Sequence, residues 1–214
     1  MNGLKKLTKP KAKKKFVYLI SPTKIVSSEF FYNQIKLMFK LKRIAFFQLR
    51  LKKESKKKKF IIAKKIKKIC MKYKVKFIIN DDPYLTKKLD ADGCHLGQKD
   101  TNLVSAKKIL KKKIIGITCH NSKKLIKKAI KNKVNYIALG AFFLSKTKRV
   151  KHKANINILK WSKKATNIPI VAIGGINSSN YKKLLLNKAN FLAISGYIWN
   201  NKKYKPVEAL ERIK

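Results

Sequence analysis

The sequence has few acidic residues, few cysteines and no long apolar run. Only 9 residues are Asp or Glu, against 56 Lys and Arg, which gives a formal net charge of +47. The three cysteines have no Cys-x-x-Cys spacing and are too few for a disulfide framework, so we expect reduced thiols in a cytoplasmic protein. No apolar run approaches the roughly 18 residues of a membrane span, and residues 1–15 lack the apolar region of a secretory signal.

Arginine is also scarce, and this bears on the meaning of the charge. A strongly basic surface attracts polyanions, so a nucleic-acid-binding protein is one hypothesis. Such proteins usually use bidentate arginine contacts and concentrate their charge on one face. Here only four of the 56 basic residues are arginine, and lysines occur along nearly every segment. The joint abundance of Lys, Ile and Asn favours a bias towards AT-rich codons, with nonspecific nucleic-acid binding expected only at low salt.

The few acidic residues are unevenly placed. Five of the nine fall within twenty residues, namely Asp81, Asp82, Asp90, Asp92 and Asp100. In a chain with so few carboxylates, this cluster calls for a reason. Mg²⁺ takes oxygen ligands and usually one or two carboxylates, so the cluster predicts a magnesium site.

Short apolar runs recur along the chain, and segments of helical period separate them. Most runs are continuous rather than alternating, which is typical of strands covered on both faces in a parallel sheet. The predicted strands are 16–20, 44–49, 77–79, 93–96, 114–117, 136–139, 168–173 and 191–194. Eight strands alternating with helices in about 200 residues predict a (β/α)8 TIM barrel.

A doubly wound open sheet is the structural rival, but no glycine-rich dinucleotide fingerprint follows the first strand. The helical stripe of Ile62, Ile66, Ile69 and Tyr73 lies among outward-facing lysines. Residues 206–214 can form a closing helix. We expect residues 1–15 to be a lysine-rich lead-in and residues 16–214 to be a single catalytic domain.

Active sites of such barrels form at the carboxyl ends of the strands, where polar residues gather in this chain. Arg50 can bind two phosphate oxygens, and Lys52 and Lys148 can add point charges. The acids Asp81 and Asp100 can hold a Mg²⁺ that also binds the phosphates. Residues 174–175 and 195–196 follow the last two strands, where barrels often bind a phosphate through backbone N–H groups. The pattern indicates a transfer reaction on a metal-bound pyrophosphate beside a separate monophosphate.

Several of these residues have a structural alternative. Asp81 or Asp82 could cap the helix that begins near Pro83, and Asp92 could tie down a strand end. His95 lies within an apolar strand and is more typical of a satisfied core histidine than of a metal ligand. The role of His120 stays open. Cys94 and Cys119 are interpreted as packing residues, because no base or cationic pocket would activate them.

In order along the chain, the motifs resemble those of thiamine-phosphate synthases. The matching stretches are QLRLK (48–52), INDD (79–82), ADGCHLGQKD (91–100), GITCH (116–120), GAFFLSKTK (140–148) and AIGGI (172–176). The resemblance covers nearly the whole chain from about residue 16, and ADGCHLGQKD is its most specific motif. One stretch departs from it, because residues 144–148 read Leu-Ser-Lys-Thr-Lys where the family usually has Pro-Thr-x-Thr-Lys.

The resemblance implies a Mg²⁺-dependent transferase that joins a pyrimidine pyrophosphate to a thiazole phosphate and releases pyrophosphate. It implies that Asp81 and Asp100 bind Mg²⁺ and that Arg50, Lys52 and Lys148 are catalytic. The residues implied to contact the pyrimidine pyrophosphate are Gln48, Arg50, Lys52, Asn80, Thr118 and Lys148. Those implied to hold the thiazole phosphate are Ser145, Thr147, Gly175 and Ser195.

Two rival functions remain beside this one. A thiazole tautomerase shares the barrel but does no pyrophosphate chemistry, so it would not need Arg50, Lys52, Asp81, Asp100 and Lys148 together. A basic nucleic-acid-binding protein would need a localised arginine-rich face. The sequence leaves the oligomeric state open, including a homo-oligomer.

Overall fold

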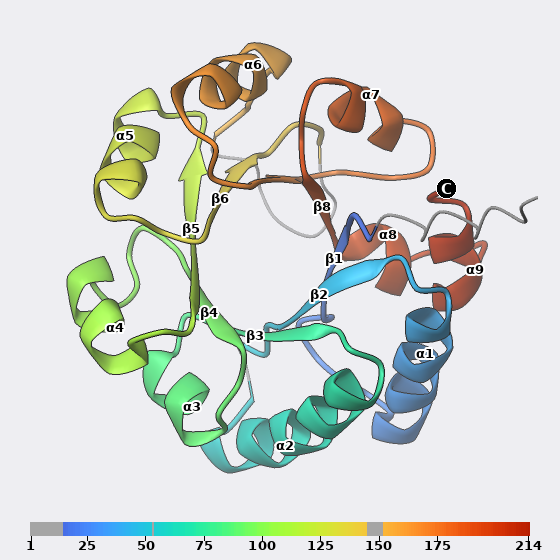
Figure 1. The fold of residues 1–214 in the computed structure, drawn as a ribbon. Coiled ribbons are helices and arrows are strands. Elements are labelled where there is room, and N and C mark those ends of the chain that lie inside the picture. The colour runs from blue at the N-terminus through green and yellow to red at the C-terminus, as the bar shows by residue number, and fades with distance from the viewer. Residues whose placement is uncertain (1–14, 53, 145–151) are drawn as a thin grey trace, which may run out of the picture.

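The computed structural model describes residues 15–52, 54–144 and 152–214. Eight parallel strands pair in sequence order, and β1 pairs with β8 to close the barrel. Figure 1 looks along the barrel, with the strands in the centre and the helices around them. The strands are β1 (Val17–Ile20), β2 (Ile44–Leu49), β3 (Lys76–Asn80), β4 (Gly93–Leu96), β5 (Ile114–His120), β6 (Tyr136–Gly140), β7 (Ile170–Ile173) and β8 (Phe191–Ile194).

The helices surround the barrel and connect its strands. They are α1 (Ser28–Lys40), α2 (Lys56–Lys72), α3 (Pro83–Lys88), α4 (Leu103–Leu110), α5 (Lys123–Lys131), α6 (Ile156–Ala165), α7 (Tyr181–Leu186), α8 (Gly196–Trp199) and α9 (Pro206–Glu211). Side-chain oxygens of Ser27, Ser55 and Ser122 accept hydrogen bonds at the first turns of α1, α2 and α5. These caps satisfy amide groups that the helix itself leaves without an acceptor.

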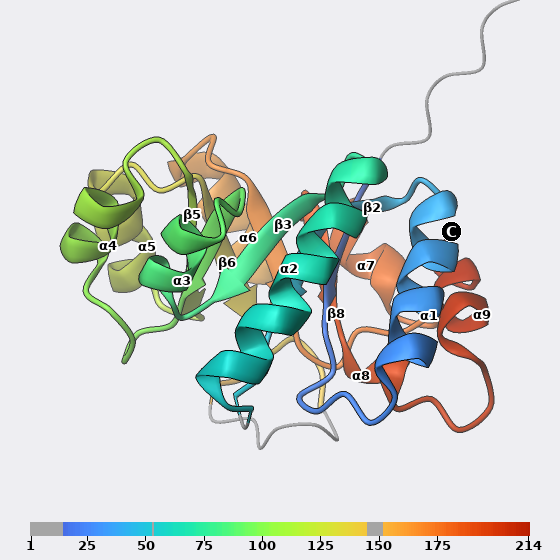
Figure 2. The same cartoon turned by 90° about the horizontal axis from the view of Figure 1, so that it is seen from below.

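Apolar side chains fill both faces of the strands, which explains why the strand sequences are continuous apolar runs. Inside the barrel, one cluster includes Tyr18, Ile78, Tyr136, Val171 and Ala193. A larger cluster lies between the strands and the helices. In the side view, the loop after β1 and helix α8 lie at the same end of the barrel (Figure 2). This end is the mouth, where the carboxyl ends of the strands meet.

The predicted barrel is confirmed, and the open-sheet alternative is wrong because β1 and β8 are hydrogen-bonded neighbours. All eight predicted strands are present, with ends that differ by a few residues. In α2, Ile62 and Ile66 are buried as predicted, whereas Ile69 and Tyr73 are only partly buried. The predicted closing helix ends at Glu211 rather than Lys214. Residues 1–14 of the predicted lead-in lie outside the described residues.

In the described part of the chain, none of the helices has the length and apolar character required to cross a membrane.

Candidate active site

Two strand ends place the first polar pair at the mouth. Gln48 lies near the end of β2 and Asn80 is the last residue of β3. The Gln48 Nε2 donates to Asn80 Oδ1 at 2.5 Å, and only 3% of Gln48 is exposed. An amide pair held this way keeps fixed positions, because breaking it would leave a buried polar group without a partner.

The carboxylate cluster lies beside this pair. The Asp81 carboxylate forms an ion pair with Lys52, Oδ2 to Nζ 2.9 Å, and a hydrogen bond with the Asp100 carboxyl group. Asp81 adopts a positive φ of 63°, and its N–H donates to the His95 carbonyl at 2.8 Å. The Gly97 N–H donates to Asp100 Oδ2 at 2.7 Å, and a Cβ at Gly97 would collide with this carboxylate. Two carboxyl groups from separate strand ends are thus held in contact.

The two carboxyl groups have opposite pKa shifts. Burial would raise the pKa of Asp81, but the hydrogen bonds from Asp100 and Lys52 outweigh burial and lower it. Burial and the hydrogen bond to the charged Asp81 raise the pKa of Asp100. Two adjacent carboxylates repel each other. A cation bound between them would remove this repulsion, so the donor set suits a hard divalent metal.

An open pocket of about 400 Å³ adjoins the cluster and is lined by Lys52, Asn80, Asp81 and Lys59 among others. Arg50 follows β2, and its backbone N–H donates to Ser21 Oγ at 2.8 Å. No described residue forms an ion pair or a hydrogen bond with its guanidinium group. The guanidinium is therefore available to a ligand, whereas Lys52 is paired with Asp81.

Thr118 in β5 contacts a buried histidine. His95 Nε2 lies 2.9 Å from Thr118 Oγ1, and His95 Nδ1 lies 2.9 Å from the Tyr136 hydroxyl. Burial lowers the pKa of His95 to about 4, opposed by the nearby Asp81 charge and reinforced by Arg50. The ring is neutral near pH 7. His95 is a satisfied interior histidine, which confirms that interpretation of it.

The opposite side of the mouth is formed by β7 and β8. Gly174 and Gly175 have φ values of 104° and 61°, and a Cβ at either position would collide with the backbone of residues 141–144. Only glycine fits both this conformation and this space. Ser195 Oγ donates to the Ser21 carbonyl at 3.2 Å. Ser145, Thr147 and Lys148 lie outside the described residues.

The five clustered aspartates have different roles, and the structural alternatives expected for Asp82 and Asp92 are confirmed. Asp82 caps α3 through Leu85 N–H at 2.8 Å. Asp92 accepts from Phe77 N–H at 2.8 Å and ties β4 to β3. Asp90 is exposed and pairs with Lys67 and Lys113. In the described residues, no group of three or more His, Cys, Asp and Glu could hold a metal. Of the five aspartates, Asp81 and Asp100 are the two whose carboxyl groups are in contact at the mouth.

The structure gives contacts for three further residues of the predicted motifs and adds one residue that was not predicted. Cys94 and Cys119 are buried free thiols whose pKa burial raises to about 12, which fits packing residues. The His120 ring lies against His152, with centroids 4.4 Å apart.

Sequence reasoning missed Ser21, which contacts both Arg50 and Ser195. The available signal is its position directly after β1, because polar residues at the other strand ends also face the mouth.

The fold and this mouth define a class: a TIM-barrel enzyme whose mouth brings together two carboxyl groups in contact and cationic side chains. Comparison with known proteins gives the family. The model of the thiamine monophosphate synthase family matches residues 17–198, and the chain belongs to that family.

Individual relatives agree with this assignment. The chain is 66% identical to a thiamine-phosphate synthase of Pelagibacter ubique, over 95% of this chain and 98% of that protein. It is 35% identical to one of Erythrobacter litoralis, over 90% and 92%. The fold is similar to that of thiamine phosphate pyrophosphorylase from Pyrococcus furiosus, with a TM-score of 0.82, 23% identity and coverage of 94% and 95%.

Proposed function

We propose that the protein is a thiamine-phosphate synthase, which joins the pyrophosphate ester of 4-amino-5-hydroxymethyl-2-methylpyrimidine to a thiazole phosphate. The products are thiamine phosphate and pyrophosphate. The observation that carries the proposal is the contact of Asp81 with both Asp100 and Lys52 at the mouth. This contact sits in a chain that matches a thiamine-phosphate synthase at 66% identity along nearly its whole length.

The reaction needs charge stabilisation more than acid–base chemistry. The bond between the pyrimidine methylene carbon and the ester oxygen breaks with its electron pair on oxygen, so pyrophosphate leaves and a pyrimidine carbocation remains. The thiazole nitrogen then donates its lone pair to that carbon. The chain's tasks are to hold the leaving pyrophosphate and to align the nucleophile. Arg50 donates to the pyrophosphate oxygens, with Lys148 as a second cation.

Asp81 and Asp100 are the residues that would hold Mg²⁺. Their contact and the raised pKa of Asp100 support this proposal, because a bound cation would relieve the repulsion between the two carboxylates. Bound Mg²⁺ would neutralise negative charge on the pyrophosphate. In the structure, the Lys52 ammonium group lies 2.9 Å from the Asp81 carboxylate and neutralises part of its charge. We expect Lys52 to turn to the pyrophosphate when metal and substrate bind, because half of its side chain is exposed.

The remaining substrate contacts follow the two sides of the mouth. Gln48 and Asn80 orient the pyrimidine pyrophosphate from the β2–β3 side, and Thr118 donates to it from β5. Gly175 and Ser195 hold the thiazole phosphate on the β7–β8 side. The family motif adds Ser145 and Thr147 to this group, although both lie outside the described residues. Glycine at 175 leaves the backbone uncovered where a phosphate can approach.

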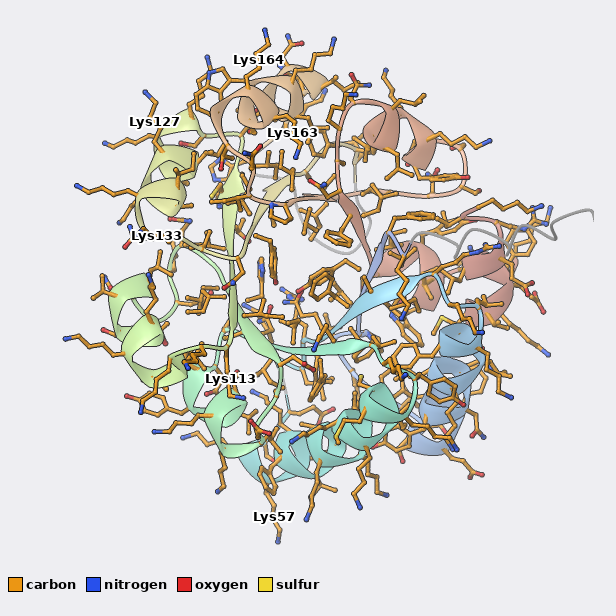
Figure 3. The ribbon with its side chains drawn as sticks, in the orientation of Figure 1. Lys57, Lys113, Lys127, Lys133, Lys163 and Lys164 are labelled. Carbon is orange, nitrogen blue, oxygen red and sulfur yellow. The ribbon has the colours of Figure 1, made fainter. Side chains whose placement is uncertain are left out.

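The rival functions fit the molecule less well. A thiazole tautomerase has no use for paired carboxylates with an adjacent lysine and a free guanidinium. For a nucleic-acid-binding protein, lysines should concentrate on one face, but Lys57, Lys127 and Lys164 point outward from different sides of the ring of helices (Figure 3). We place the enzyme in the cytoplasm, which suits its three free cysteines. Its partners are the two small substrates, with no specific nucleic acid.

The test is to incubate purified protein with both precursors and Mg²⁺ and to measure thiamine phosphate. Asp81→Asn and Asp100→Asn should lower turnover sharply and change its dependence on Mg²⁺ concentration. Asp90→Asn is the matched control, because Asp90 belongs to the same stretch but is exposed and precedes β4 at the other end of the barrel. Absence of thiamine phosphate would refute the function, and unchanged kinetics of both mouth variants would refute the metal site.

A further inference from the structure

Four polar side chains form a continuous chain of hydrogen bonds inside the barrel. The Tyr18 hydroxyl lies 2.7 Å from the Tyr136 hydroxyl, which lies 2.9 Å from His95 Nδ1. His95 Nε2 lies 2.9 Å from Thr118 Oγ1. This hydrogen-bond chain starts at Tyr18, the second residue of β1, and reaches the mouth at Thr118. Among these four residues, only Thr118 is partly exposed.

The packing around these residues holds their rings in place. Tyr18 and Tyr136 are 1% and 2% exposed, and the rings of His95 and Tyr136 stack with a 15° interplanar angle. A Cβ on Gly116 would collide with the Tyr136 ring, so the glycine in β5 provides the space that this ring occupies. Because the rings cannot move far, the polar atoms of these side chains cannot exchange their hydrogen-bond partners for others.

The neutral histidine allows two directions for the hydrogen bonds. In the first, Tyr18 donates to Tyr136, Tyr136 donates to Nδ1, and the Nε2–H of His95 donates to Thr118 Oγ1. In the second, every donor is reversed: Thr118 donates to Nε2, the Nδ1–H donates to Tyr136, and Tyr136 donates to Tyr18. The two directions differ in which terminal hydroxyl group keeps a hydrogen that is not donated within the hydrogen-bond chain: that of Thr118 in the first, that of Tyr18 in the second.

The Tyr18 end decides between them. Among the described residues, Tyr136 is the only hydrogen-bond partner of the Tyr18 hydroxyl. In the second direction, the hydroxyl hydrogen of Tyr18 would be buried with no acceptor, which is unfavourable. In the first direction every hydrogen inside the barrel has an acceptor. The first direction also leaves the Thr118 hydroxyl hydrogen free to point into the mouth.

We propose that His95 is a positioning residue that keeps the Thr118 hydroxyl as a hydrogen-bond donor to the pyrophosphate. The inference rests on the proposed function, which places that anion at this mouth. Tyr136 holds His95 in the Nε2–H tautomer, and Tyr18 sets the direction. A histidine with a free Nε2 lone pair would instead accept the Thr118 hydrogen and compete with the substrate. A preorganised donor needs no reorientation as charge develops on the leaving group.

The first test reads the tautomer directly. The chain has three histidines, so ¹⁵N-histidine labelling and a two-dimensional ¹H–¹⁵N spectrum near pH 7.5 resolve them, and the His95→Gln spectrum assigns the His95 signals. We expect a protonated Nε2 and an unprotonated Nδ1. A protonated Nδ1, or an equal mixture of tautomers, would overturn the proposal. This measurement needs no substrate, so it stands even if the wild-type protein makes no thiamine phosphate and the proposed function fails.

The second test is kinetic. Tyr136→Phe removes the donor that selects the tautomer, and we expect kcat/KM for the pyrimidine pyrophosphate to fall about tenfold, with KM for the thiazole phosphate unchanged. Tyr181→Phe is the matched control. It also deletes a hydroxyl from a buried tyrosine, but one that contacts Lys214 and stacks on Phe16, away from the mouth. The control should stay within twofold of wild type.

A double-mutant cycle separates positioning from general loss of structure. Thr118→Val should lower kcat/KM by about 10- to 100-fold, because it removes a hydrogen bond to a charged group. Combining it with Tyr136→Phe should add little, since both changes act through the same hydroxyl. Independent, multiplicative losses would overturn the proposal, as would equal effects of Tyr136→Phe and Tyr181→Phe. If Tyr136→Phe does not fold, the tautomer of the wild-type protein decides.

Discussion

His95 should make the stability of the protein depend on pH, and the size of this effect follows from its burial. The folded pKa is about 4, against an ordinary value of 6.5. Between these values the unfolded chain binds a proton at His95 and the folded chain does not. The free energy of unfolding is therefore not reduced by His95 above about pH 6.5, and it falls as the pH is lowered towards 4. At pH 5 the loss relative to pH 8 is about 2 kcal/mol.

Urea unfolding followed by tryptophan fluorescence at pH 8, 6.5 and 5, at constant ionic strength, measures this loss. His95→Gln should be less stable than wild type at pH 8 but should lose about 2 kcal/mol less on going to pH 5. The carboxylates remote from His95 titrate alike in both proteins and cancel in the difference, whereas Asp81 interacts with His95 and belongs to the measured effect. His152→Gln is the control, because it removes an exposed histidine and should keep the wild-type slope. A His95→Gln slope equal to that of wild type would refute the reasoning.

Three further predictions concern the mouth, the barrel interior and the surface charge. Arg50→Ala should cost roughly 2–4 kcal/mol of transition-state stabilisation, as for other preorganised donors; a loss below tenfold in kcat/KM would count against its role. Gly116→Ala should destabilise the fold by about 1–3 kcal/mol in urea, because the added methyl group overlaps the Tyr136 ring; unchanged stability would contradict that packing. Polynucleotide binding should disappear at moderate salt in a fluorescence anisotropy titration, because it depends on diffuse charge. Tight sequence-specific binding at physiological salt would contradict this view of the lysines.

The strands could be predicted because the barrel covers both of their faces, which requires continuous apolar runs. The candidate site could be predicted in outline because the mouth collects polar residues from the strand ends. The different structural roles of the individual aspartates could not be predicted from the sequence. Asp81 and Asp82 are neighbours in the sequence, yet Asp81 lies in the carboxylate cluster and Asp82 caps α3. The positive φ at Asp81 separates the two side chains, and an Asp-Asp pair before a proline does not reveal that conformation.

The interior hydrogen-bond chain was beyond sequence reasoning for a different reason. Tyr18 and Tyr136 are 118 residues apart and lie on β1 and β6, which are not paired strands. Only a closed barrel of the observed register brings their hydroxyl groups together across its interior. A one-residue slip of β6 would turn Tyr136 outward, because alternate residues of a strand face opposite sides. His95 Nδ1 would then be buried without a partner. The same contacts that orient Thr118 therefore also select the register of β6. Substitutions of residues in this hydrogen-bond chain should change stability and turnover together.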